Sequence, residues 1–181
     1  MKSFSEQVRD RESCREYGEK RPGRAQLEAM VRCAGLAPSA CNSQPWRFYA
    51  VNDEHLSPEV AKCTQQLGLN KFTAHCPAFI VICEEKARLM KRLVEHIDSQ
   101  HFAQIDIGIV TAHLCYAAQE QGLSTCILGC FDEDALKELL GIGDDEKVRL
   151  VLCVGYAANK ELREKKRKDM DEIFKYFGKE E

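Results

Sequence analysis

The stretch "IDIGIVTAHLCYAAQEQ", residues 105–121, determines the architecture that we expect. Wound into a helix, its apolar residues cover every side, and a helix that is apolar all round is normally buried. Gly122 follows directly and supplies the left-handed residue that commonly ends a helix. The charge-free part, 107–119, is shorter than the roughly 18–20 residues that a membrane span needs. The sequence therefore predicts a long helix inside a protein core.

Shorter elements are predicted on both sides of this helix. Apolar periodicity and turn residues predict helices over 3–9, 24–36, 57–68, 86–99, 132–142 and 169–178, and strands over 47–51, 79–83, 124–131 and 148–157. The order lacks a strict alternation of strand and helix, which favours an α+β fold with a mixed sheet flanked by helices. We expect one domain over 1–158, followed by a charged arm over 159–181.

Composition excludes several classes of protein. The chain has 181 residues, is 44% apolar and carries a net charge of −3, which suits a packed core and argues against a dedicated nucleic-acid binder. The ten cysteines form no C-x-x-C pair and mostly lie in apolar runs, which is typical of core thiols in a reducing compartment. The first residues lack the apolar run of a signal peptide. We therefore expect a cytoplasmic protein with no nucleic-acid or membrane partner.

The stretch "RESCREY", residues 11–17, is the first candidate site. In an extended backbone Arg11, Ser13 and Arg15 project from one face and form a cradle suited to an anion. The alternative is a solvated charged face that includes Glu12 and Glu16, and spacing alone favours this alternative.

The stretch "APSACNSQPW", residues 37–46, is the second candidate. Its prolines exclude a regular helix or a central strand, and its small residues let a ligand approach the backbone. An ordinary loop that satisfies its own backbone explains the composition equally well. The basic run 160–168 likewise fits a solvated face or a set of phosphate contacts.

Other chemistry finds no support in the sequence. The stretch "GIGDD", 141–145, lacks the third glycine of a dinucleotide-binding loop and follows a predicted helix instead of a strand. The histidines show no metal-ligand spacing, so no metal site is expected. We find no G-x-S-x-G motif and no local signature of a nucleophilic cysteine.

Four motifs in order resemble the nitroreductase family of FMN enzymes. They are R-x-S-x-R-x-Y at 11–17, P-S-x-x-N-x-Q-P-W at 38–46, G-L-S-T-C-I-L-G at 122–129 and K-x-R at 165–167. The resemblance spans residues 9 to about 175, and the second motif is the most specific. It implies an α+β homodimer that packs through the central helix, holds two FMN molecules at the interface and uses its C-terminal arm in the dimer.

The resemblance also implies roles for individual residues. Arg11 and Ser13 would contact the FMN phosphate, and Arg15 would lie near flavin N1 and O2, where a cation stabilises the reduced ring. The remaining implied contacts are Pro38, Ser39 and Ala40 over the ring from the partner subunit, Asn42 at the ribityl chain, Asn70 at the pyrimidine edge, Leu128 and Gly129 at N5, and Lys165 and Arg167 at the phosphate. No residue is assigned as a catalytic acid or base.

The implied reaction takes electrons from NADH or NADPH and delivers them to a small-molecule acceptor such as a nitroaromatic or a quinone, by a ping-pong mechanism. Two alternatives remain open. One is a non-enzymatic FMN-binding or sensing module. The other is a family member specialised for a different reduction such as dehalogenation, with a substrate lid between about 85 and 104 that includes His101 and Phe102.

Overall fold

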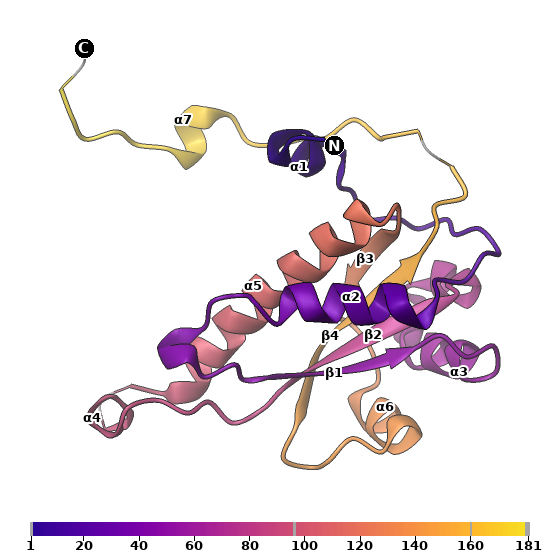
Figure 1. The fold of residues 1–181 in the computed structure, drawn as a ribbon, viewed down its shortest axis with the longest axis horizontal. Coiled ribbons are helices and arrows are strands. Elements are labelled where there is room, and N and C mark those ends of the chain that lie inside the picture. The colour runs from indigo at the N-terminus through magenta and orange to yellow at the C-terminus, as the bar shows by residue number, and fades with distance from the viewer. Residues whose placement is uncertain (1, 96, 160, 180–181) are drawn as a thin grey trace.

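The protein is built around one antiparallel sheet, seen in a computed structural model that describes residues 2–95, 97–159 and 161–179. The strands are β1 (Trp46–Val51), β2 (Ala78–Glu84), β3 (Ser124–Leu128) and β4 (Lys147–Gly155), in the order β1-β2-β4-β3 (Figure 1). Each neighbouring pair runs antiparallel, and an isolated parallel bridge joins Ser13 to Thr125. The predicted combination of helices with a central sheet is confirmed.

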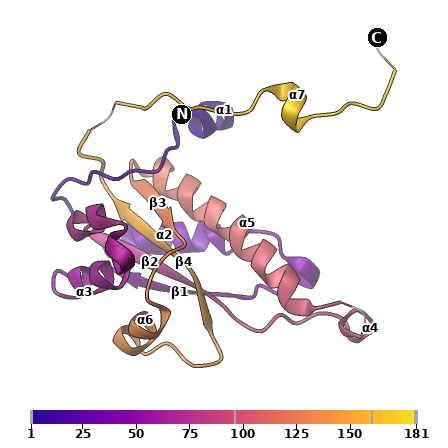
Figure 2. The same ribbon diagram turned by 180° about the vertical axis from the view of Figure 1, so that it is seen from behind.

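Helices cover both faces of the sheet. α2 (Arg24–Ala34) and α5 (Ser99–Glu120) pack on one face, while α3 (Leu56–Cys63) and α6 (Glu133–Leu140) pack on the other (Figures 1 and 2). β2 shows why: Ile80 and Ile82 belong to the first core and Phe79 and Val81 to the second, and all four are fully buried. A strand that is apolar on both faces belongs at the centre of a sheet covered on both sides.

The central helix forms as predicted but is not buried on every side. α5 begins after Asp98, whose carboxylate accepts a hydrogen bond from the Gln100 N–H at 3.0 Å. It ends before Gly122, which has the expected positive φ of 72°. Leu114 is fully buried, whereas 51% of Ile105 is exposed. The helix therefore presents an open apolar face in the single chain.

Three predicted helices are wrong in extent, and one of them, over 169–178, reduces to α7 (Met170–Ile173). α3 begins at Leu56, whose N–H donates to the Asp53 carboxylate at 2.8 Å, and ends at Cys63, five residues before the predicted end. The predicted helix over 86–99 reduces to α4 (Lys91–Val94), because neighbouring backbone N–H groups bond to side chains elsewhere. His96 in that stretch lies outside the described residues.

α1 (Phe4–Asp10) and the described part of the C-terminal segment lie on the same side of the body (Figures 1 and 2). α1 packs on the end of α5, with the Phe4 and Tyr116 rings 5.3 Å apart. The C-terminal segment passes α1 and extends away from the body with α7 (Met170–Ile173) near its end (Figures 1 and 2). The predicted arm also includes Lys160, Glu180 and Glu181, which lie outside the described residues. Among the described helices, none has the length and apolar character to cross a membrane.

Candidate functional site

The "RESCREY" segment is fixed in extended form beside the sheet. The Cys14 N–H donates to the Thr125 carbonyl at 2.9 Å, and the Gly18 N–H donates to the Tyr156 carbonyl at 2.9 Å. Cys14 and Tyr17 are buried in the core, where burial raises the pKa of the Cys14 thiol. Arg11 and Ser13 are half-buried, and Arg15 is exposed. The extended backbone that was expected for a cradle is therefore present.

The beginning of the C-terminal segment docks on this cradle. The Arg163 N–H and Nε donate to Glu12 Oε2 at 3.1 and 3.3 Å, and its Nη2 donates to the Ser13 carbonyl. Lys165 follows two residues later, and its charge contributes to lowering the pKa of Asp10, after the stronger contribution of the Lys2 hydrogen bond. Residues far apart in sequence thus meet above β3.

Several cations at this place form no ion pair within the described residues. Neither Arg11 nor Arg15 forms an ion pair with any residue that the structure describes. Lys165 Nζ is buried without a hydrogen-bond partner among those residues. A buried charged donor without a partner is costly, so this arrangement suits an additional anion. The fit to a phosphate group is good, because Arg, Lys and Ser are the side chains that bind it.

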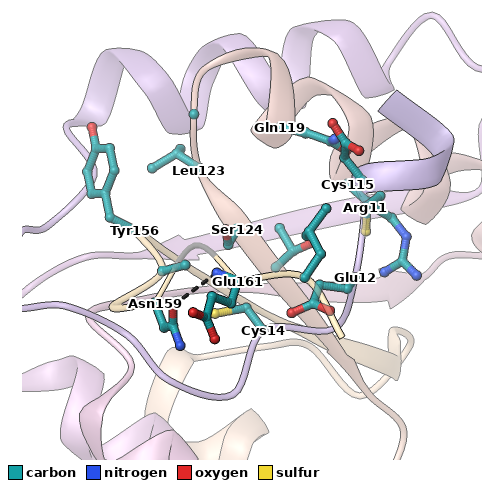
Figure 3. A pocket seen from close by; sticks show the side chains of 15 residues that line it. Arg11, Glu12, Cys14, Cys115, Gln119, Leu123, Ser124, Tyr156, Asn159 and Glu161 are labelled. Atoms are coloured by element: carbon teal, nitrogen blue, oxygen red, sulfur yellow. Dashed lines mark hydrogen bonds between the residues drawn. The ribbon is translucent and has the colours of Figure 1, made fainter. Parts of the chain in front are cut away.

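A cavity of about 480 Å³ lies between this cradle, the end of α5 and the beginning of β3 (Figure 3). Figure 3 shows Arg11 and Glu12 on one side of it and Tyr156 on the other. Asn159 Oδ1 accepts a hydrogen bond from the Glu161 N–H at 2.9 Å at its border. The C-terminal segment therefore forms one wall of the cavity.

The second candidate loop lies elsewhere and folds on itself. Residues Ala40–Asn42 form a 3-10 turn, η1, and Cys41, Asn42 and Gln44 adopt positive φ. Ser39 Oγ accepts from the Gln44 N–H at 2.9 Å, and the Ala40 N–H donates to the Asp106 carboxylate at 3.1 Å. Asp106 is 4% exposed, and burial raises its pKa. The loop is thus fixed to α5 through one buried carboxylate.

The two candidate segments lie at opposite ends of α5. The loop contacts the helix at Asp106, whereas Cys115 and Gln119 lie beside the cradle in the cavity wall. With a helical rise of 1.5 Å per residue, Asp106 and Cys115 are about 14 Å apart along the axis. A single chain therefore does not bring Pro38, Ser39, Ala40 and Asn42 to the cradle, which agrees with the expectation that this loop serves a partner subunit.

Among the remaining predicted residues, Asn70 lies beside the backbone that follows Leu128 and Gly129, whereas Arg167 bonds within its own segment. Asn70 has a φ of 51°, and its Nδ2 donates to the carbonyls of Thr64 and Cys130 at 3.0 and 3.2 Å. It thereby holds the backbone that follows Leu128 and Gly129 at the end of β3. Arg167 donates to the neighbouring Lys166 carbonyl and reaches no residue of the cradle within the described chain.

Two residues that organise the site, Arg163 and Asp106, were not predicted from the sequence. Arg163 lies in a basic run in which nothing distinguishes it from its neighbours. Asp106 carries a clearer signal, because it is a charged residue inside an otherwise apolar helix and such a residue needs a specific partner.

Comparison with known proteins matches most of the chain to one family. The family model described as "Nitroreductase family" matches residues 8–156. A protein from Archaeoglobus fulgidus, provisionally named an NADH dehydrogenase/NAD(P)H nitroreductase, is 28% identical over 86% of each chain. An iodotyrosine dehalogenase 1 homolog from Caenorhabditis elegans is 24% identical over 96% of this chain, which spans only 61% of that relative's length.

A solved structure shows the same fold with a bound cofactor. It is a provisionally named nitroreductase from Exiguobacterium sibiricum in complex with FMN, with a TM-score of 0.83 and 22% identity over 97% of this chain and 98% of that one.

Proposed function

Because the chain belongs to the nitroreductase family, we propose that it is an FMN-dependent oxidoreductase that takes electrons from NADH or NADPH and reduces a nitroaromatic, a quinone or a related small acceptor. The observation that carries the proposal is that Arg11 and Arg15, on the extended segment that bears Ser13, form no ion pair within the described residues, and that the nearby Lys165 ammonium has no hydrogen-bond partner there. FMN has a phosphate that these side chains suit, and a solved relative of this fold is an FMN complex.

Each residue of the cradle has a distinct role in this proposal. Arg11, Ser13 and Lys165 bind the phosphate, while Arg167 adds a more distant charge. Arg15 lies two residues after Ser13 in the extended segment and therefore on the same face. It stabilises negative charge on the pyrimidine end of the ring. Arg163 binds Glu12 and Ser13 and thereby keeps the segment that bears Lys165 in place.

The other contacts come from the end of β3 and from a second subunit. Leu128 and Gly129 lie where Asn70 fixes the backbone, so these three residues form a rigid edge for the ring. Pro38, Ser39, Ala40 and Asn42 contact the flavin of the partner subunit, because they lie at the opposite end of α5 from their own cradle. Bound FMN supplies the hydride and electron chemistry, and the chain supplies orientation and charge.

The open face of α5 supports a homodimer. Ile105, Gly108 and Ala112 are exposed on this helix at a spacing that places them along one stripe. The C-terminal arm over 159–181 also exposes large apolar side chains, with Phe177 at 92% and Ile173 at 64%. Exposed apolar surface of this kind marks an interface. We therefore assign both features to contacts with the partner subunit.

The proposal is tested with the purified protein after addition of FMN. We expect a yellow complex that loses its flavin absorbance with NADH or NADPH in the absence of oxygen and regains it with a nitroaromatic or quinone. A chain that binds no FMN would refute the proposal. A complex that stays oxidised with both nicotinamides would instead indicate a sensing module.

Reductive dehalogenation is a second candidate reaction at the same site. It is favoured by the similarity to the C. elegans iodotyrosine dehalogenase homolog across 96% of this chain. Anaerobic turnover of 3-iodotyrosine with chemically reduced protein distinguishes the two, since a nitroreductase without this specificity releases no iodide.

A further inference from the structure

The segment that joins β2 to α5 concentrates positive charge in a chain whose net charge is negative. Lys86, Arg88, Lys91 and Arg92 are all exposed, and no acidic residue interrupts the stretch between them. A loop of this charge attracts anions and repels cations before any contact is made.

Of the four carboxylates near these cations, Glu84, Glu85 and Asp98 are engaged elsewhere, while Glu95 is exposed and forms no ion pair within the described residues. Glu84 is buried and binds the guanidinium of Arg149, and Glu85 binds Arg47 at 2.7 Å. Asp98 caps α5. Within the described part of the chain, none of the four cations of the segment forms an ion pair. Their charge is therefore available to a bound molecule.

The backbone of this segment is fixed against the loop that we assign to the flavin. The Arg88 N–H donates to Ser43 Oγ at 2.6 Å, directly after η1, and the Glu85 N–H donates to the Pro45 carbonyl at 3.1 Å. The Ala87 N–H donates to Gln100 Oε1 at 2.8 Å, which joins the segment to the first turn of α5. Figures 1 and 2 show α4 beside this end of α5. The cations thus begin next to the flavin-covering loop.

The same segment also offers apolar contacts. Met90 is 48% and Val94 is 53% exposed, and in the adjoining first turn of α5 the Phe102 ring packs edge-on against His101 at a ring distance of 6.0 Å. Methionine adapts to flat aromatic molecules of varied shape. Apolar and cationic side chains on one short segment match a molecule with a flat apolar body and an anionic substituent.

We propose that residues 86–92 bind the carboxylate or phosphate of the molecule that lies on the flavin, so that the preferred substrate is a flat apolar compound with a negative charge. This inference rests on the proposed function, because it needs the flavin beside the loop. The anion belongs either to the electron acceptor or to the 2′-phosphate of NADPH, and both present the same chemistry to Arg88 and its neighbours.

The test uses the FMN-loaded protein and two probes of equal shape. Binding of 4-nitrobenzoate and of 4-nitrobenzamide is titrated through the flavin absorbance, without reductant, so the result does not depend on turnover. The variants are Arg88→Gln and the double change Lys91→Gln with Arg92→Gln. Lys62→Gln, an exposed lysine of α3, is the matched control.

We expect nitrobenzoate to bind more tightly than the amide, and each removed charge to weaken nitrobenzoate binding about two- to fivefold, with no change for the amide or in the control. The preference should shrink as salt is raised. A parallel arm compares the rates at which NADPH and NADH reduce the flavin. If the variants slow reduction by NADPH but not by NADH, the anion is the 2′-phosphate of NADPH.

The proposal would be overturned if two ratios were the same in wild type and in every variant. These are the ratio of the Kd values of the amide and of nitrobenzoate, and the ratio of the rates of flavin reduction by NADPH and by NADH. The oxidoreductase function would remain intact. Failure to retain FMN would instead refute the proposed function, and this inference with it. Retained flavin and an unchanged circular dichroism spectrum show that each variant is folded.

Discussion

Lys165 offers the sharpest test of the cradle, because its replacement should act in opposite directions on the empty and the loaded protein. Its ammonium is buried without a partner among the described residues, while the rest of the side chain is half-buried. Lys165→Met keeps the length and apolar stem and removes the charge. In the FMN-free protein this change relieves the cost of the unpaired donor, which we take as about 1 kcal/mol for a partly exposed residue.

The empty variant should therefore be more stable than the wild type. A gain of about 1 kcal/mol corresponds to a rise in Tm of about 2–4 °C for a chain of this size. In the loaded protein the same change removes a charge-assisted hydrogen bond to the phosphate, worth about 1.5–3 kcal/mol. The Kd for FMN should then increase about 10- to 100-fold.

Both quantities are measured on the same samples, the first by thermal unfolding of the FMN-free protein and the second by quenching of flavin fluorescence. Lys166→Met is the control, since Lys166 is exposed in the same segment and should change neither. A variant that is less stable when empty and binds FMN with unchanged affinity would show that Lys165 only supports the tail, and our reading of the cradle would be wrong.

Three further predictions concern the ring, the dimer and the loop. Arg15→Ala should lower the reduction potential of bound flavin and Arg15→Lys should restore it, as measured by redox titration; an unchanged potential with FMN retained would exclude Arg15 from the ring. Ile105→Glu places a charge on the open face of α5 and should yield a monomer that loses FMN, as seen by analytical ultracentrifugation; a stable dimer would contradict this. Burial raises the pKa of Asp106, so the folded chain keeps the Asp106 proton at a pH where the unfolded chain has released it. The contribution of Asp106 to the free energy of unfolding therefore falls as the pH rises above the ordinary carboxyl pKa. Urea unfolding at pH 4.5 and 7 should show a smaller loss for Asp106→Asn than for wild type, and equal losses would contradict the sign.

The sequence predicted the parts of the fold that depend on local pattern. The apolar run 79–83 has the length of a buried strand and forms one, and the helix that ends before Gly122 followed from its apolar residues and its left-handed glycine. The stretch 86–99 misled because its alternation of charged and apolar residues suits a helix, yet its backbone is held by Ser43 and Gln100. Contacts of that kind join residues distant in sequence, and periodicity carries no information about them.

The extended form of one candidate segment was predictable from the sequence, whereas the arrangement of the candidate segments was not. The spacing of Arg11, Ser13 and Arg15 indicated an extended cradle, and the structure confirms the extended backbone. The sequence alone did not indicate that the loop at 38–42 and this cradle occupy opposite ends of α5. That separation depends on where each segment packs along the helix, which is a property of the folded chain.

The separation along α5 has a genetic consequence. If each flavin takes its phosphate contacts from one subunit and its ring cover from the other, a defect in the cradle and a defect in the loop complement each other between chains. Two such mutant subunits, each inactive with its own kind, would form a mixed dimer in which one site carries both lesions and the other carries neither. Co-expression of the pair should therefore restore one working centre in every heterodimer, with about half the activity of a normal dimer.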